Sequence, residues 1–460
     1  MSSFKAYFIT TAIPYVNSKP HIGHAQEFIL ADSLARYYRS QGQRVVFQSG
    51  TDDNATKNVL AAKAAGLSVK EFVDLNADKF ESLLTFLDAK PDLFVRTASE
   101  KHFTSVDRFL RGLNREDLYT SSYSGLYCSG CEDFYNEQDL VNGLCPDHLK
   151  KPEHIEESNT FFRLSKYQQK IAELIESDTI KITPSSKKKE ILSFVNQGLS
   201  DISLSRSAAR TQGWGIPFPD KADQTVYVWI DALINYVSGD PKNWAEDIYK
   251  VHVIGKNVWK FHAVYWPALL LSAGLSLPNE IVVHGFLTNE GTKISKSLGN
   301  GIDPLDIISR YGVDAFRFYL LGVLSFEQDA DFVEQNLLSS YNSELANKLG
   351  NLVSRVLTLG KDLDLQKKAP EQLKVEYKDL RKDAFERIGH INSQINTLKP
   401  WELLKSGDSN GELRGYLSEW VGQLSIISRL LEPLVPEGAG RLSQLLVDRK
   451  NRIEQLYPRR

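Results

Sequence analysis

Two short apolar runs on either side of a helical stretch constrain the fold of this chain more than any other feature. Residues 5–12 and 44–52 have the apolar character of buried strands, and residues 22–41 between them have a helical pattern. Parallel strands joined by a helix form a βαβ unit, in which ligand-binding groups gather at the carboxyl ends of the strands. Three further apolar runs predict more strands, at 225–232, 251–256 and 280–287. The sequence therefore predicts an α/β fold with a parallel sheet.

The order of these patterns predicts that the α/β domain is split. A cysteine-containing stretch of mixed character interrupts the alternation of strands and helices. From about residue 335 the apolar residues recur at helical spacing, which is typical of a bundle. We expect the first half of a Rossmann-like domain, a connective insertion, the second half of that domain and an α-helical domain, at 1–115, 116–204, 205–334 and 335–460.

The composition is that of an ordinary globular protein. Of 460 residues, 42% are hydrophobic and 25% are charged, and no apolar run is long enough to span a membrane. The N-terminus lacks the layout of a secretory signal, so we expect a cytoplasmic protein without a membrane partner. The net charge of −3 does not by itself indicate a polyanionic partner. Neither a GxxxxGK[ST] nor a GxGxxG motif is present, so any nucleotide is held by other means.

The stretch IPYVNSKPHIGHAQ, residues 13–26, follows the first predicted strand directly. Its prolines and its Asn-Ser-Lys cluster predict a turn, with a helix beginning close to Pro20. His21 and His24 then share one face of that helix, and Gly23 between them has no side chain. Free backbone N–H groups and imidazoles at a helix N-terminus favour an anion. Taken alone, however, a histidine pair beside a turn is more often ordinary surface.

All three cysteines lie close together, in the segment YCSGCEDFYNEQDLVNGLCPDH. Cys128 and Cys131 form one C-x-x-C hairpin, and Cys145 and His148 form a second pair with the same spacing. Four such ligands on two tight turns suit one tetrahedral Zn²⁺, and a site closed by four protein ligands is structural rather than catalytic. His154 is an alternative fourth ligand, although it breaks the hairpin spacing.

The segment GTKISKSLGN, residues 291–300, is bounded by glycines and carries Lys293 and Lys296. Cations on a loop of this kind suit negative charge that develops during a reaction. On its own, the segment is also compatible with a solvated surface turn.

Together the two segments resemble the HIGH and KMSKS elements of class I aminoacyl-tRNA synthetases, and the whole chain resembles the methionyl-tRNA synthetases. The resemblance covers almost the full length, and its further segments occur in the family's order. These are GTDDNATKN at 50–58, the zinc knuckle, GWGIPFP at 213–219, YVWIDALINY at 227–236, GKNVWKFHAVYWPA at 255–268, HGFLT at 284–288, NLVSR at 351–355 and KPW at 399–401.

The resemblance implies a ligase that activates L-methionine with ATP and transfers it to tRNA(Met). Mg²⁺ would accompany ATP, and a monomer is expected. His21 and His24 would contact the phosphates, while Lys293 and above all Lys296 would meet the departing pyrophosphate. Asp52, at the end of a predicted strand, would bind the ammonium of the amino acid.

The resemblance also implies the residues that surround each substrate. The methionine pocket would include Asp52 together with Ala12, Ile13, Tyr15, Trp229, Ala232, Leu233, Tyr236 and His262. An aromatic pocket suits a thioether, because sulfur packs favourably against ring edges. ATP would contact His21, Gly23, His24, Gly255, Asn257, Gly285, Phe286, Leu287 and Lys296, with adenine near the backbone of 285–287.

In the helical domain the family reads the anticodon, which implies roles for Asn351, Arg355 and Trp401. Asn351 and Arg355 are four residues apart and therefore share one face of a helix. An exposed Trp401 could stack on an anticodon base. The alternative is that Trp401 is a core residue at the start of a helix.

Three departures from the family pattern stand out. The loop reads KISKS, Asn257 stands where many relatives have Asp, and TDDNA at 51–55 replaces the commoner TDEHG. The Ile-for-Met change conserves volume and should cost little. Synthetases for leucine, isoleucine or valine share both motifs, but the chain has no room for their large editing insertion. A tRNA-binding paralogue with altered catalysis is the remaining alternative, although His21, His24 and both lysines are present.

Overall fold

A computed structural model of the protein divides the chain into two compact units. The first unit comprises residues 1–20, 46–84 and 90–285, and the second comprises residues 21–45, 85–89 and 286–460. The structure describes residues 6–128, 133–135, 137, 140–146, 149–289, 291–294, 301–360, 375–405, 410–447 and 455–460.

The first unit is built on a six-stranded sheet in the order β3-β2-β1-β12-β13-β7. Its strands are β1 (Ala6–Thr11), β2 (Arg44–Thr51), β3 (Leu93–Arg96), β7 (Lys181–Thr183), β12 (Tyr249–Gly255) and β13 (Glu280–His284). The pairs β2–β3, β1–β12, β12–β13 and β13–β7 are all parallel. The predicted α/β fold with a parallel sheet is therefore confirmed, although β3 and β7 were not predicted.

The strand predicted at 225–232 is wrong in its second half. Strand β11 (Lys221–Val226) ends at Val226, and helix α7 (Val228–Gly239) begins two residues later. Ten residues of α7 are buried, including its polar residues Asp231, Asn235 and Ser238, so its first residues look like a buried apolar run. Its β-branched residues Val228, Ile230 and Ile234 also favour a strand when only the local sequence is considered.

Two small antiparallel sheets lie in the sequence between the parallel strands. One has the order β5-β4-β6-β8, with β4 (Leu118–Cys128), β5 (Asp133–Tyr135), β6 (Glu153–Phe162) and β8 (Ile202–Ser203). The other has the order β10-β11-β9, with β9 (Ser205–Ser207) and β10 (Pro217–Phe218) beside β11. The longest pair, β4 and β6, stays in register from Leu118–Phe162 to Tyr127–Glu153.

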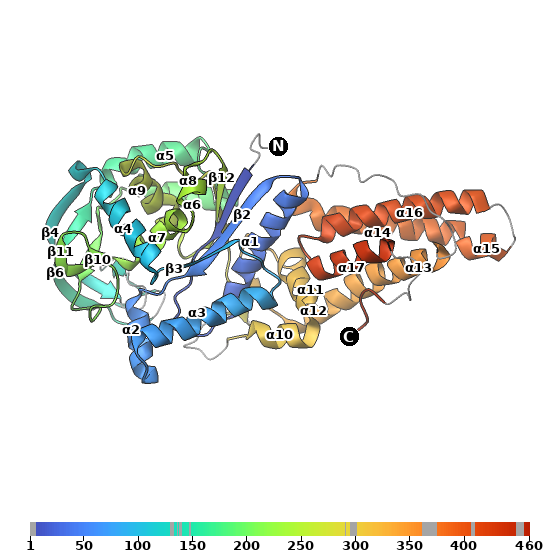
Figure 1. Cartoon of the computed structure of the whole chain (residues 1–460), viewed down its shortest axis with the longest axis horizontal. Coiled ribbons are helices and arrows are strands. Elements are labelled where there is room, and N and C mark those ends of the chain that lie inside the picture. Colours follow the sequence, from blue (N-terminus) through green and yellow to red (C-terminus); the bar gives the residue numbers. More distant parts are fainter. Residues whose placement is uncertain are drawn as a thin grey trace. The chain divides into compact units, whose positions relative to one another are not determined.

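The helices of the first unit pack on an apolar core that includes Phe8, Trp244 and Trp266. They are α2 (Thr56–Ala65), α3 (Val69–Phe86), α4 (Glu100–Gly112), α5 (Gln168–Glu176), α6 (Ser185–Asn196), α7, α8 (Pro241–Ala245) and α9 (Trp266–Ser272). A π-helical turn at Phe261–Tyr265 leads into α9. Figure 1 shows α4 beside α7, and these two helices contact each other.

The second unit is mainly helical. Its helices are α1 (Ile22–Ser40), α10 (Pro304–Tyr311), α11 (Val313–Phe318), α12 (Glu334–Ser340), α13 (Asn351–Gly360), α14 (Leu380–Leu398), α15 (Pro400–Lys405), α16 (Asn410–Leu431) and α17 (Pro436–Val447). A π-helical segment at Tyr341–Gly350 joins α12 to α13, and α14, α16 and α17 pack together (Figure 1). A small sheet β15-β14-β16 is formed by Thr292–Lys293, Leu287–Asn289 and Ala330–Asp331.

A buried ion pair fixes α1 within the second unit. Arg317 and Asp32 are both fully buried, and Arg317 Nη2 lies 2.7 Å from Asp32 Oδ2. Arg317 also donates to the carbonyl groups of Leu87 and Pro433, each at 3.0 Å. A buried charge needs polar partners in place of the water that hydrated it, and these bonds supply such partners to the Arg317 guanidinium.

In the described part of the chain, every helix is too short or too polar to cross a membrane.

Candidate active site

The predicted methionine-pocket residues of the first unit begin where β1 and β2 end. Asp52 and Tyr15 form an isolated parallel bridge, and the N–H of Asp52 donates to the carbonyl of Pro14 at 2.8 Å. The N–H of Ala12 donates to the carbonyl of Val253 in β12 at 3.1 Å. The ladder therefore continues past the strands and brings residues 12–15 beside Asp52, as the βαβ pattern predicts.

Helix α7 supplies an aromatic wall. The Trp229 ring stacks on Phe261 with centroids 3.9 Å apart, and it meets the edge of the Tyr15 ring at 5.8 Å. Trp229 and Tyr15 were predicted as pocket residues, and the structure places them together. Phe261 was missed, because only the three-dimensional contact with Trp229 distinguishes it from the other aromatic residues of its segment. Ala232, Leu233 and Tyr236 lie on the same helix and are buried.

Tyr236 and His262 form a neutral hydrogen-bonded pair. His262 Nδ1 lies 2.9 Å from the carbonyl of Val258, so it carries the ring proton and donates. Nε2 is then an acceptor, and the hydroxyl of Tyr236 donates to it at 2.7 Å. Burial lowers the pKa of His262 to about 4, so the imidazole is uncharged at neutral pH. Both protons of this pair are committed within the protein, so a thioether beside it would meet uncharged rings rather than a hydrogen-bond donor.

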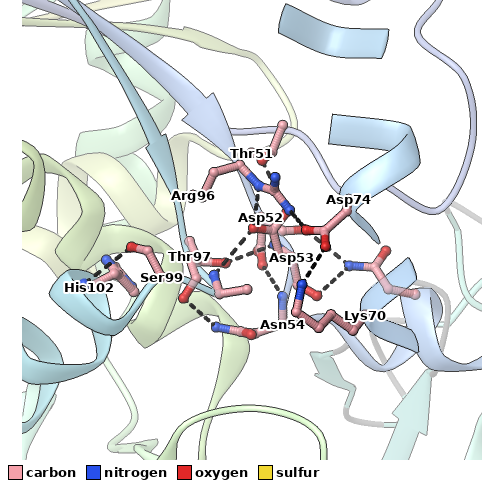
Figure 2. Close-up of polar contacts among 12 residues, drawn as sticks. Thr51, Asp52, Asp53, Asn54, Lys70, Asp74, Arg96, Thr97, Ser99 and His102 are labelled. Atoms are coloured by element: carbon pink, nitrogen blue, oxygen red, sulfur yellow. Dashed lines mark hydrogen bonds and ion pairs between the residues drawn. The ribbon is translucent and has the colours of Figure 1, made fainter. Parts of the chain in front are cut away.

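Asp52 itself is almost completely buried, and the loop that carries it is tightly hydrogen-bonded (Figure 2). Its Oδ1 accepts from the N–H of Asn54 at 3.2 Å. The neighbouring Asp53 accepts from Arg96 Nε at 2.8 Å and from the N–H of Ala98 at 3.2 Å. Burial raises the pKa of Asp53, and the Arg96 guanidinium opposes that shift.

The Arg96 guanidinium also links this loop to helix α3. Arg96 Nη2 donates to Asp74 Oδ1 at 2.9 Å, and Lys70 Nζ lies 2.6 Å from Asp74 Oδ2 (Figure 2). Asn58 adds a further restraint, because its Nδ2 donates to the carbonyl groups of Asp52 and Asp53 at 3.1 and 2.9 Å. None of these supporting residues was predicted. The partners of Arg96 lie 43 and 22 residues away, whereas Asn58 and Lys70 bond to residues nearby in the sequence.

In the second unit, His21 and His24 cap the start of α1. His21 Nδ1 accepts from the N–H of Gly23 at 3.1 Å, and His24 Nδ1 accepts from the N–H of His21 at 3.2 Å. Both rings therefore carry their proton on Nε2, and their centroids lie 3.9 Å apart. Burial lowers the pKa of His21 to about 4, and burial with the neighbouring His21 lowers that of His24 well below its usual value.

This geometry refines the prediction made from the sequence. The N–H of Gly23 donates to His21 Nδ1, so the expectation of free backbone N–H groups at this helix start does not hold for Gly23. The glycine is required for the contact, because a Cβ at position 23 would lie only 3.0 Å from His21 Cε1.

In the second unit, the start of α1 bonds to a residue that follows the KISKS segment in the sequence. The N–H of Ile22 donates to the carbonyl of Ile302 at 3.2 Å, just beyond the KISKS segment. Lys293 is in β15, whose backbone pairs with Thr288 of β14. The side chain of Lys293 and the whole of Lys296 lie outside the described residues.

The predicted ATP contacts lie at the carboxyl ends of β12 and β13 and just beyond them. Gly255 ends β12, and a Cβ there would lie 3.0 Å from Asn257 Oδ1. Gly285 directly follows β13. The N–H of Phe286 donates to Asp329 at 3.0 Å and its carbonyl accepts from the N–H of Ala330 at 3.0 Å, while Leu287 begins β14.

Two of the four predicted zinc ligands are within the described residues. Cys128 ends β4 and Cys145 follows the bridge between Val141 and Leu144, and both are buried. The N–H of Cys145 donates to the carbonyl of Lys150 at 2.9 Å, and the carbonyl of Cys145 accepts from the N–H of Leu149 at 2.8 Å. Cys131 and His148 lie outside the described residues, and no set of three potential metal ligands occurs within them. The alternative ligand His154 instead contacts Ser124, at 3.3 Å.

The predicted anticodon residues are exposed in the second unit. Asn351 begins α13 and Arg355 lies one turn later, and both side chains are exposed. Trp401, in α15, is 45% exposed. The alternative interpretation of Trp401 as a core residue is therefore wrong.

Comparisons with known proteins agree with this geometry. The chain matches the family model "tRNA synthetases class I (M)" over residues 7–151 and 148–357, and it is thus a class I tRNA synthetase. It is 38% identical to the methionine--tRNA ligase of Synechocystis sp., over 97% of this chain and 90% of that protein. It is 37% identical to the methionine--tRNA ligase of Rhizobium meliloti, over 97% of this chain and 92% of that protein.

A solved structure shows the same similarity. The methionyl-tRNA synthetase of Mycobacterium tuberculosis in complex with methionyl-adenylate matches with a TM-score of 0.84 and 34% identity, over 96% of this chain and 94% of that one. The chain belongs to the methionyl-tRNA synthetase family.

Proposed function

We propose that this protein joins L-methionine to tRNA(Met) in two steps. In the first step a carboxylate oxygen of methionine attacks the α-phosphorus of ATP, the bond to the β-phosphate oxygen breaks, and pyrophosphate leaves. In the second step a hydroxyl at the tRNA 3′ end attacks the carbonyl carbon of methionyl-adenylate, and AMP leaves. The single observation that carries the proposal is the buried, uncharged Tyr236–His262 pair among aromatic rings of the unit that holds the buried Asp52.

In this proposal the first unit recognises the amino acid. Asp52 binds the ammonium, and the buried position makes this charge pair strong because little water competes for it. The rings of Tyr15 and Trp229 pack on the thioether, and Ala232 and Leu233 complete the apolar surface. The remaining contacts are assigned to the main chain of Ala12 and Ile13.

The second unit is proposed to manage the phosphates. The two Nε2–H groups of His21 and His24 donate to phosphate oxygens, and because both imidazoles are neutral they need no carboxylate partner. Lys293 and Lys296 are assigned to the departing pyrophosphate, where the negative charge increases in the transition state. ATP brings Mg²⁺, which neutralises phosphate charge. Adenine is assigned to the backbone of 285–287 and the ribose to Gly255 and Asn257.

The helical segment 335–460 is proposed to bind the anticodon. Asn351 and Arg355 are exposed on one helix face, and both side chains can form paired hydrogen bonds with a base edge. The exposed Trp401 offers a stacking surface for an unpaired base.

A structural Zn²⁺ is proposed in the connective insertion, held by Cys128, Cys131, Cys145 and His148. The burial of the Cys128 and Cys145 thiols supports this assignment, because zinc requires ligands that are held together and shielded. We further propose a cytoplasmic monomer.

Exchange of labelled pyrophosphate into ATP tests this function, with each of the twenty amino acids added in turn. We expect exchange with methionine and much less with the others. A tRNA-binding paralogue without catalysis would bind tRNA(Met) but show no exchange with any amino acid, and that result would refute the proposal.

A further inference from the structure

Asn54 lies two residues after Asp52 and connects three separate segments of the first unit. Its main-chain N–H donates to Asp52 Oδ1 at 3.2 Å. Its side-chain Nδ2 donates both to the carbonyl of Thr97 at 3.0 Å and to Asp231 Oδ2 at 2.8 Å. Thr97 directly follows β3 and Asp231 lies in α7, so one residue joins the Asp52 loop, the end of β3 and the pocket helix (Figure 2 shows the bond to Thr97).

The other oxygen of Asp231 is also occupied. Asp231 Oδ1 lies 2.6 Å from His102 Nε2, and His102 Nδ1 lies 2.6 Å from the hydroxyl of Ser238. Asp231 and His102 are both buried to 1% exposure. A buried carboxylate with a partner on each oxygen cannot rotate without losing a bond, so Asp231 holds Asn54 in one orientation.

The fold of the loop does not depend on the Asn54 side chain alone. The N–H of Asp53 donates to Thr97 Oγ1 at 2.8 Å, Arg96 binds the Asp53 carboxylate, and Asn58 binds the carbonyl groups of Asp52 and Asp53. These bonds restrain the backbone from the β3 side and from α2. The Asn54 side chain adds the link from the loop to α7, the helix that carries Trp229, Ala232 and Leu233.

We propose that Asn54 is a positioning residue for methionine, which through Asp231 fixes the Asp52 carboxylate relative to the pocket helix. The inference rests on the proposed function, in which Asp52 binds the ammonium and α7 binds the side chain. An α-amino acid holds these two groups at a nearly fixed separation, so the groups that bind them must be held at a matching separation. Asn54 acts through Asp52 and does not itself contact the substrate.

The isosteric substitution Asn54→Asp gives the sharpest test. It places a second carboxylate within hydrogen-bonding distance of Asp231 Oδ2, and two such groups cannot both be ionised without repulsion. The bond to the Thr97 carbonyl is lost at every pH, because the new carboxyl group has at most one proton. At low pH the pair shares that proton and keeps the bond between residue 54 and Asp231, whereas at high pH this bond is lost too. We expect the KM for methionine of this variant to rise about 10-fold between about pH 6 and pH 9. A displacement of an active-site group by about 1 Å can cost about 100-fold, and we expect the Asp52 carboxylate to move by less than that. The wild-type KM should show no such rise.

Three comparisons separate positioning from a general structural role. The KM for ATP and the kcat of exchange should change little in Asn54→Asp, because the ammonium contact is made in ground state and transition state alike. Asn54→His introduces the residue that is commoner in the family and supplies a ring N–H donor in place of the amide N–H. Its KM for methionine should therefore stay near normal. Asn76→Asp makes the same chemical change at a buried site in α3, and its KM for methionine should not depend on pH.

The proposal is wrong if the methionine KM of Asn54→Asp follows the wild-type pH profile. It is also wrong if the KM values for methionine and ATP rise together and the melting temperature falls, which would indicate general loosening. Wild-type protein without methionine-dependent exchange would instead refute the proposed function, so the two failures are distinguishable.

Discussion

Replacing Gly23 by alanine separates the chemistry of the first histidine motif from the stability of the helix it begins. A Cβ at this position would lie 3.0 Å from Cε1 and 3.1 Å from Nδ1 of His21, whereas ordinary contacts begin at about 3.4 Å. The His21 imidazole must therefore move by a few tenths of an ångström, which lengthens its bond to the N–H of residue 23.

The effect of this substitution on stability should be small, whereas its effect on the rate of adenylate formation should be large. Alanine is favoured over glycine in a helix by up to about 1 kcal/mol, and losing an N-cap bond costs about 0.5–2 kcal/mol. These terms oppose each other, so the free energy of unfolding should change by only about 1 kcal/mol. A misplacement of about 1 Å can cost about 100-fold in rate, so a shift of a few tenths of an ångström should lower the rate of adenylate formation about 10-fold.

The rate is measured as pyrophosphate exchange at saturating methionine and ATP, and stability is measured by urea unfolding. Gly389→Ala is a matched control, because Gly389 lies inside α14 and a Cβ there meets nothing within 4 Å. It should stabilise the protein by up to about 1 kcal/mol and leave exchange unchanged. A Gly23→Ala variant with a normal exchange rate would refute the role assigned to the His21 geometry.

Four further predictions follow from the site. Burial lowers the pKa of His21 to about 4, so below pH 6.5 the unfolded chain binds more protons at this residue than the folded protein does. The contribution of neutral His21 to the free energy of unfolding is therefore present above pH 6.5 and is lost as the pH falls towards 4. Urea unfolding at several pH values measures this loss. Lys296→Ala should lower kcat of exchange about 10²–10³-fold with little change in the KM for methionine, and a raised KM with normal kcat would contradict its role. Trp401→Ala should lower kcat/KM for tRNA aminoacylation about 10–100-fold and leave exchange intact, whereas equal losses in both would refute anticodon stacking. Cys145→Ser should reduce bound zinc and lower the melting temperature, and wild-type protein without zinc by metal analysis would exclude the knuckle.

The sequence predicted correctly those elements of the fold that neighbouring residues define. β1, α1 and β2 begin and end within one residue of the sequence-based ranges, because an apolar run, a turn rich in proline and a helical pattern follow one another there. Asp52 was found at the carboxyl end of β2 for the same reason. Helix α7 was misread because its first residues continue the apolar run of β11, and the helical spacing of Asp231, Asn235 and Ser238 is visible only when residues beyond 232 are included.

The supporting residues of the pocket could not be predicted in this way. Asn54, His102 and Asp231 are separated by many residues, and each is an ordinary polar residue in its own segment. Only the folded chain shows that Asp231 accepts bonds from both of the others. Buried polar groups are nearly always hydrogen-bonded, but the sequence does not show which residues will be the partners.

Helix α1 shows that position in the chain does not decide where an element packs. It connects β1 to β2, two strands of the first unit, yet residues 21–45 belong to the second unit. The cause is Asp32, a carboxylate in the middle of the helix that is fully buried against Arg317 at 2.7 Å. Asp32 also pairs with Arg36 Nε at 2.7 Å, so it would keep a partner without Arg317. Removing Asp32 would instead leave the buried Arg317 without a carboxylate, at a cost of about 3–5 kcal/mol, so the pair helps to fix α1 to α11. The histidines at the start of α1 are therefore held by the same packed unit that carries Asn351 and Trp401, a relation that no pattern within residues 13–26 indicates.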